Sequence, residues 1–266
     1  MLTVSRLSTT PVRSFALQHP DSIEVGPRGV ADDRRYSLHT AEDGRLFDAV
    51  KYGPLVQLRA RLDRENGSER LSMELPTGEV VADEVRLDKP IQVELHGRRF
   101  TARAVIGPWA EAVSAWAGRP LRLYRSERLA DEEDRYPVSI VSEASVEELA
   151  RQGNGGDPVD SRRFRMLVEV AGADRPHQED EWLGREVRIG EVVVRVTKPD
   201  SRCVITTQDP DTGARDFPTL HVINQYRGLR DGSKLDFGVY ADVIQPGVVA
   251  VGDPVQPILR GEIEGE

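Results

Sequence analysis

The chain is poor in cysteine, because among its 266 residues only Cys203 carries a thiol. A single cysteine excludes an internal disulfide, a structural zinc site built mainly from cysteine, and a four-cysteine iron–sulfur cluster. A chain without disulfides suits a reducing compartment, and we therefore expect a cytoplasmic protein.

The chain also lacks long apolar runs and an excess of positive charge. No run approaches the roughly 18–20 apolar residues needed to span a bilayer. Arg6 interrupts the apolar residues of segment 1–7, so neither a signal peptide nor a membrane segment is expected. The net charge of −9 argues against a nucleic-acid surface, which must neutralise phosphates.

Common hydrolytic and phosphate-binding motifs are missing as well. No two of the five histidines are four residues apart, and the sequence contains no Gly-x-Ser-x-Gly. The glycine-rich stretch 153–158 has neither the Gly-Lys-Ser/Thr of a phosphate-binding loop nor a strand pattern before it. The sequence therefore gives little support to ordinary hydrolase or nucleotide-binding classes.

The sequence does contain a series of short strand patterns. Residues 55–62, 69–75 and 192–197 alternate apolar and polar side chains, which predicts half-buried strands. Two further strands within residues 91–104 predict a hairpin that turns at Gly97, because glycine tolerates positive φ. Many short strands punctuated by glycine and proline predict a mainly β, barrel-like fold with a few helices.

Two segments predict helices. Residues 108–118 begin with proline, end with glycine, and place Trp109 and Trp116 on one helical face, which predicts core packing for both rings. Residues 142–152 begin with Ser142 as the N-cap and carry acidic side chains in the first turn.

An acidic run, residues 131–134, predicts the division of the chain into two domains. It follows the strand pattern of residues 121–124 and precedes Pro137, as a solvated linker would. We therefore expect a first domain over residues 1–125, a linker over residues 126–136, and a second domain over residues 137–262.

Cys203 lies at the end of an alternating apolar run, directly after Arg202. A nearby cation favours the thiolate, the form that binds soft metals and attacks electrophiles. The alternative is that Cys203 is a small buried hydrophobic residue, as many free cysteines are.

Six segments, in order along nearly the whole chain, resemble the motifs of MOSC-domain proteins, and within that family they are most similar to the amidoxime-reducing components. The most specific is Lys198-Pro-Asp-Ser-Arg-Cys-x-x-Thr-Thr-x-Asp-Pro-Asp-Thr-Gly213. The others are Thr10-Pro-Val-Arg-Ser14, Gly29-Val-Ala-Asp-Asp-Arg-Arg-Tyr36, Ile140-Val-Ser-Glu-Ala-Ser145, Arg163-Phe-Arg165 and Val251-Gly-Asp-Pro-Val255.

This resemblance implies an amino-terminal β-barrel domain packed on a MOSC β-barrel domain. It also implies binding of the molybdenum cofactor, with the Cys203 thiolate as the protein ligand to molybdenum, and reduction of N-hydroxylated small molecules by two electrons. Pyridoxal phosphate binding is a further property described for the family in general. Because the chain cannot hold an iron–sulfur cluster on four cysteines, the electrons would come from a separate flavin, haem or iron–sulfur protein.

The resemblance also implies a set of site residues. Arginine donates hydrogen bonds in a rigid fork that suits phosphate and pterin edges. The expected cofactor-binding residues are Arg13, Ser14, Arg34, Ser142, Arg165, Arg202 and Cys203, with weaker claims for Arg35, Arg162 and Arg163. Cys203 and Asp209 are the expected catalytic residues. Asp209 and Asp211 have a structural alternative, because Asp-Pro-Asp-Thr-Gly is a strong turn sequence.

Two positions depart from the family pattern. Arg13 stands in place of a lysine, and Leu167 stands where the family has an asparagine able to hydrogen-bond the cofactor. Two other functions therefore stay open beside the reductase: a non-redox carrier of the cofactor, and a carrier of sulfur as a persulfide on Cys203. A relic that binds no cofactor is a third alternative, motivated by Leu167.

Overall fold

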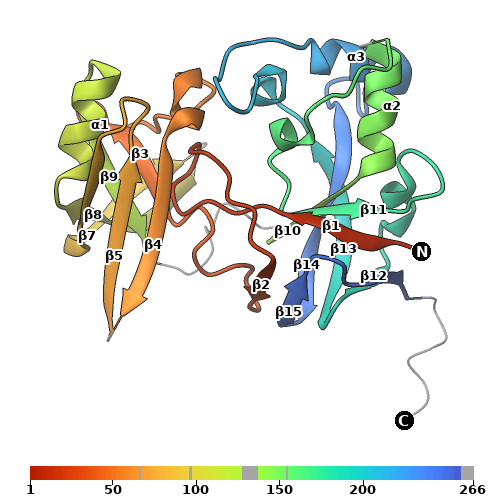
Figure 1. Ribbon diagram of the computed structural model, residues 1–266, viewed down its shortest axis with the longest axis horizontal. Coiled ribbons are helices and arrows are strands. Elements are labelled where there is room, and N and C mark those ends of the chain that lie inside the picture. Colours follow the sequence, from red (N-terminus) through yellow and green to blue (C-terminus); the bar gives the residue numbers. More distant parts are fainter. Residues whose placement is uncertain (66, 96–97, 128–136, 154, 259–266) are drawn as a thin grey trace.

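The computed structural model describes residues 1–65, 67–95, 98–127, 137–153 and 155–258, and shows two lobes side by side (Figure 1). The first lobe contains a four-stranded and a three-stranded antiparallel sheet. The four-stranded order is β3 (Tyr36–Thr40), β9 (Leu121–Ser126), β8 (Arg98–Ile106) and β7 (Arg86–Leu95). The three-stranded order is β4 (Arg59–Glu65), β5 (Ser68–Glu74) and β6 (Val80–Glu84).

Helix α1 (Trp109–Ala117) contributes to the core of the first lobe. Gly118 ends it with a left-handed φ of 67°, which glycine adopts at little cost. The Trp109 ring is fully buried and its Nε1 donates to the Leu71 carbonyl at 3.0 Å, whereas Trp116 is half-buried and packs edge-on against Tyr52. The predicted helix and its packing face are confirmed.

The second lobe is built on a seven-stranded sheet. Its order is β1 (Thr3–Leu7), β11 (Val168–Ala171), β10 (Val138–Ser142), β14 (Asp236–Gln245), β13 (Val192–Ser201), β12 (Glu186–Ile189) and β16 (Val255–Pro257). Only the β10–β11 pair is parallel. The Val255 amide donates to the Leu2 carbonyl at 3.0 Å, so the two ends of the sheet meet and the sheet nearly closes into a barrel.

Helices α2 (Glu143–Gly153) and α3 (Thr219–Arg227) pack together on the second lobe. The described residues also form four 3-10 helices: η1 (Gly53–Gln57), η2 (Ser161–Phe164), η3 (Gln178–Trp182) and η4 (Val204–Thr207). Ser142 caps α2 by accepting the Ser145 amide at 3.3 Å, as the sequence predicts. None of the helices that the described residues form combines the length and apolarity needed to cross a bilayer.

The amino-terminal strands lie with the second lobe. Strand β1 pairs with β11, and β2 (Ser22–Val25) pairs with β15 (Gly247–Ala250). The red amino-terminal strand accordingly lies beside the blue and green elements (Figure 1). The predicted division into residues 1–125 and 137–262 stays a prediction, and residues 128–136 of the predicted linker lie outside the described part of the chain.

The mainly β class with a few helices is confirmed, but one predicted strand is partly wrong. Residues 55–57 form the end of η1, not of a strand, because Pro54 begins a tight turn and both Leu55 and Val56 are buried. The strand starts later, at Arg59. The turn residues His96 and Gly97 of the predicted hairpin lie outside the described residues, although β7 and β8 do pair as expected.

Candidate functional site

Cys203 follows the end of β13 and caps η4, with an exposed side chain. Its carbonyl accepts the Thr206 amide at 3.2 Å and the Thr206 hydroxyl at 3.0 Å, which fixes the backbone at this turn. The alternative that Cys203 is a buried hydrophobic residue is wrong, because its thiol faces solvent.

The Arg202 guanidinium is held inside the second lobe. It forms an ion pair with Asp200, donates to the Phe164 carbonyl, and lies 5.2 Å above the Phe164 ring. The side chains of Arg202 and Asp200 are only 6% and 3% exposed. Burial raises the pKa of Asp200, and Arg202 opposes that rise. One donor of Arg202, the buried Nε, has no hydrogen-bond partner among the described residues.

Three of the residues expected to bind the cofactor share an uncommon backbone conformation. Ser14, Arg34 and Arg165 have φ values of 72°, 52° and 53°, and they are three of the five non-glycine residues with positive φ in the described part of the chain. Such conformations cost about 1–3 kcal/mol each and concentrate at functional sites. Ser14 Oγ accepts the Ala49 amide at 3.0 Å, which holds Ser14 in place.

Arg13, Arg34 and Arg165, which we call the arginine group, lie close to one another. Arg34 Nη2 donates to the Arg165 carbonyl at 2.7 Å, and Arg165 Nη2 donates to the Phe15 carbonyl at 2.6 Å. Loss of solvent, together with the positive charges of Arg34 and Arg13, lowers the pKa of Arg165 to about 9, and Asp33 partly opposes this shift. An anion bound here would offset this concentration of positive charge.

The arginine group and Cys203 belong to one region. Arg202, beside Cys203, donates to the carbonyl of Phe164, the residue before Arg165. The charge of Arg34 also opposes the rise in the pKa of Asp200, the ion-pair partner of Arg202. The structure thus brings together residues from four of the six sequence motifs.

Ser142 lies in a different network. Its hydroxyl donates to Glu179 Oε2 at 2.7 Å, and Ser145 Oγ donates to Glu179 Oε1 at 2.8 Å. Glu179 is fully buried, and this burial raises the pKa of its carboxyl group. The hydrogen bonds of Ser142 therefore connect it to Glu179 and α2, and its expected contact with the cofactor stays a prediction.

Asp209 and Asp211 form the turn that their sequence predicts. Asp209 Oδ1 accepts the Thr212 amide and the Thr212 hydroxyl, both at 2.7 Å. Asp211 forms a bidentate ion pair with Arg162 at 2.8 and 2.7 Å. The bonds of Asp209 account for its side chain as a turn residue, whereas Asp211 ties the turn to Arg162; a catalytic role for Asp209 stays a prediction.

The turn 209–213 contacts the first lobe. Gly213 lies against Gly53 so closely that a Cβ on Gly213 would be 2.0 Å from the Gly53 carbonyl oxygen. Gln57 Nε2 donates to the Thr212 carbonyl at 3.1 Å, and Gln208 Nε2 donates to the Ala49 carbonyl at 2.8 Å. The segment that follows Cys203 therefore lies where the two lobes meet.

Arg163 stabilises this segment from the other side. Its buried guanidinium donates to the carbonyls of Thr206 and Gln208, at 3.2 and 3.3 Å, and pairs with Asp216. Arg35, by contrast, pairs with Glu69 inside the first lobe. The sequence analysis gave Arg163 only a weaker claim as a cofactor-binding residue and did not single out Gln208, because contacts so distant in sequence leave no local signal.

Leu167 packs in the core of the second lobe and is 4% exposed. Its amide donates to Ser139 Oγ at 2.9 Å, and its carbonyl accepts the Ser8 amide at 3.0 Å. The substitution of leucine at this position is thus compensated by core packing, and no unpaired polar atom is left at Leu167 itself.

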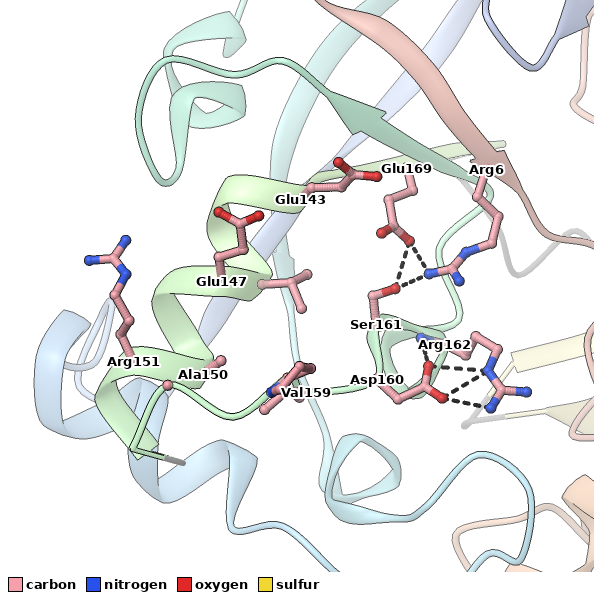
Figure 2. A pocket seen from close by; sticks show the side chains of 13 residues that line it. Arg6, Glu143, Glu147, Ala150, Arg151, Val159, Asp160, Ser161, Arg162 and Glu169 are labelled. Carbon is pink, nitrogen blue, oxygen red and sulfur yellow. Dashed lines mark hydrogen bonds and ion pairs between the residues drawn. The ribbon is translucent and has the colours of Figure 1, made fainter.

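A cavity of about 810 Å³ lies beside α2, and of the expected site residues only Arg162, which had a weaker claim, is among those that line it (Figure 2). Arg6, Glu169 and Ser161 form one wall through their mutual hydrogen bonds, and Val146 and Val159 are among its apolar lining. This cavity is separate from the arginine group.

The residues present fit a metal cofactor that supplies most of its own ligands. The described residues contain no group of three or more His, Cys, Asp or Glu side chains able to hold a metal ion alone. The exposed Cys203 thiol would add one soft ligand. Arg202 Nε and Gln208 Oε1 are buried and each has no hydrogen-bond partner among the described residues, so each has capacity for a bond to a bound polar group.

Comparison with known proteins gives four results. Residues 127–256 match the family model for the MOSC domain. The mitochondrial amidoxime-reducing component 1 of Xenopus laevis is 30% identical over 290 residues, which cover 97% of this chain and 82% of that protein. The human mitochondrial amidoxime-reducing component 1 is 34% identical over 141 residues, which cover 50% of this chain and only 40% of that protein. Among solved structures, the YUAD protein of Bacillus subtilis aligns over 96% of this chain and 94% of its own, with a TM-score of 0.45 and 14% identity.

Proposed function

This chain belongs to the MOSC-domain family that includes the mitochondrial amidoxime-reducing components, and from that premise we propose that it binds the molybdenum cofactor and reduces N-hydroxylated small molecules. Cys203 is the proposed protein ligand to molybdenum. The cofactor, when bound, supplies the two-electron chemistry that removes oxygen from the substrate.

The observation that carries this proposal is the convergence of Ser14, Arg34 and Arg165. Their sequence positions are far apart, all three have left-handed backbone conformations, and the arginine group concentrates positive charge near an exposed thiol. Arginine binds phosphate with two parallel hydrogen bonds, so the arginine group suits the phosphate of a pterin cofactor. The buried Arg202 Nε is positioned to donate one further hydrogen bond.

The protein residues bind and orient the cofactor in this proposal, and the segment after Cys203 supports the thiol. Arg163 and Gln208 hold the segment 206–208 against both lobes, so the thiol stands on a rigid support. Because no more than one cysteine is present, the electrons come from a separate protein carrying flavin, haem or an iron–sulfur cluster. That partner is part of the proposal.

A carrier of the cofactor, or of a persulfide on Cys203, is the second candidate function. The exposure of the Cys203 thiol favours it, since a sulfur atom handed to another protein must be accessible. Retained molybdenum without turnover under any electron donor would support the cofactor carrier. A persulfide on the purified protein would support the sulfur carrier.

Molybdenum content tests the proposal. Wild type and Cys203→Ala are expressed in a host that makes the cofactor, and metal per chain is measured by elemental analysis. We expect about one molybdenum per wild-type chain and at least a tenfold loss, or an altered molybdenum spectrum, in Cys203→Ala. The loaded wild type should then reduce an amidoxime with a chemically reduced donor. If the wild type contains no molybdenum when expressed in a host that loads a control molybdoenzyme, the proposed reductase function is contradicted.

A further inference from the structure

Gln208 lies five residues after Cys203 and is 4% exposed. Its Nε2 donates to the Ala49 carbonyl at 2.8 Å, a bond between the two lobes. This bond determines the orientation of the side-chain amide. If Oε1 took the place of Nε2, two acceptor oxygens, Oε1 and the Ala49 carbonyl oxygen, would face each other without a hydrogen between them. The Gln208 oxygen, Oε1, therefore faces away from Ala49.

That Oε1 is buried and has no hydrogen-bond partner among the described residues. A buried polar atom without a partner is uncommon and costs stability, and at a functional site it indicates a group that binds there. An amide oxygen can only accept a hydrogen bond, so its partner must be an N–H or O–H donor.

The position of Gln208 is fixed by its backbone. Its amide donates to the Ile205 carbonyl at 3.0 Å, and its carbonyl accepts Arg163 Nη1 at 3.3 Å. The side chain is held at its far end by Ala49. Gln208 therefore cannot readily turn its oxygen toward another protein donor.

The surroundings connect Gln208 to the arginine group. The Ala49 amide donates to Ser14 Oγ at 3.0 Å, and Ser14 follows Arg13. Gln208 is thus linked through a single residue, Ala49, to the region proposed to bind the cofactor. The arginine group offers hydrogen-bond donors in that region, whereas Gln208 Oε1 offers an acceptor.

We propose that Gln208 Oε1 accepts a hydrogen bond from an N–H group of the ligand bound beside Cys203, which makes Gln208 a specificity-determining residue of this site. This inference rests on the proposed function. Two sources offer the same N–H chemistry: the amino edge of the pterin, and the amino group of an amidoxime substrate or its amidine product.

The experiment compares Gln208→Met with Gln57→Met in the full-length, cofactor-loaded protein. Methionine has the length of glutamine but neither the amide donor nor the amide oxygen. Gln57 is the matched control, because its Nε2 also donates to a carbonyl across the lobes, that of Thr212 at 3.1 Å, while its Oε1 is not a buried orphan. The difference between the two variants isolates the effect of Gln208 Oε1.

Two readouts separate the two sources. The first is the amount of molybdenum and pterin retained per chain after prolonged dialysis. The second is the affinity for benzamidine measured by calorimetry, with benzoate as the comparison ligand because it has the same shape but no N–H group. If the pterin supplies the N–H, Gln208→Met loses cofactor about tenfold faster than Gln57→Met. If the substrate supplies it, cofactor retention is equal and benzamidine binds about tenfold more weakly to Gln208→Met.

Equal behaviour of the two variants in both readouts would overturn the inference and assign Oε1 to a bound water. Should Gln208→Met not fold, Gln208→Leu is compared with Gln57→Leu in its place, because leucine also lacks both the amide donor and the amide oxygen, and the same two readouts decide the outcome. Wild type that holds no molybdenum would instead refute the proposed function, so the two failures are distinguishable.

Discussion

At the scale of single residues, the pair of Asp200 and Arg202 shows how the chain supports Cys203. Arg202 is adjacent to the thiol in sequence, yet its guanidinium is directed into the protein, where it contacts Asp200, Phe164 and Met166. The pair therefore anchors the end of β13 from which the Cys203 turn begins. Arg202 thus positions Cys203 through these contacts, in addition to the hydrogen bond that we propose its Nε donates to the cofactor.

Removing Asp200 should be costly, because Arg202 would be left as a buried charge without its counter-ion. We expect Asp200→Ala to lower the free energy of unfolding by about 3–5 kcal/mol, measured by urea denaturation. Asp63→Ala is the control, since Asp63 pairs with Arg61 on the surface, where both are well exposed, and should cost less than about 1 kcal/mol. Equal losses in the two variants would show that the Asp200 pair is as weak as a surface pair.

At the scale of elements, the turn 209–213 and η1 form a close backbone contact between the two lobes. Gly213 has φ of 74°, and its Cα approaches the Gly53 backbone where no side chain fits. Glycine is required here for two reasons, the left-handed conformation and the missing Cβ. The contact places the segment after Cys203 against the lobe that carries Ser14 and Arg34.

Gly213→Ala should therefore separate the turn from η1. A control is Gly44→Ala, because Gly44 has a similar φ of 67° but nothing within 4 Å of its Cβ position. Gly44→Ala should cost about 1 kcal/mol for backbone conformation alone, whereas Gly213→Ala should cost about 1–3 kcal/mol more because of the clash. Thermal unfolding measures both, and similar melting temperatures would mean that the turn moves away from η1 without loss.

At the scale of the whole molecule, the amino terminus completes the second lobe. Val4 and Leu7 of β1 and Ile23 and Val25 of β2 belong to the core cluster of that lobe. Strand β1 also covers the edge of β11 and closes the sheet toward β16. The region matched by the MOSC family model, residues 127–256, therefore lacks part of its own core.

We expect residues 127–258 expressed alone to fail to fold cooperatively. The exposed β11 edge and the missing apolar side chains leave a sheet prone to aggregation. A chain in which residues 1–30 are joined to residues 127–258 by a flexible linker should recover dispersed amide resonances and a cooperative thermal transition. A well-folded 127–258 fragment with the same melting temperature would contradict this view and favour the simple division at residues 126–136.

Local features were predictable because they depend on residues close in sequence. The proline, glycine and tryptophans of residues 108–118 define α1, and Ser142 defines the start of α2. The turn at Asp209 follows from side-chain bonds within three residues. The partly wrong strand at residues 55–57 shows the limit of this reasoning, because two adjacent buried residues break a period of two.

The sequence by itself determined the mainly β class, the family, and the motif that carries Cys203, since period, turn chemistry and motif are all short-range properties of the chain. Tertiary structure alone decided which residues meet. Arg34 reaches the Arg165 carbonyl across 131 positions, and Gln208 reaches Ala49 across 159. It also decided that Leu167 enters the core and Arg202 turns inward, because both depend on burial and on charges supplied by distant strands.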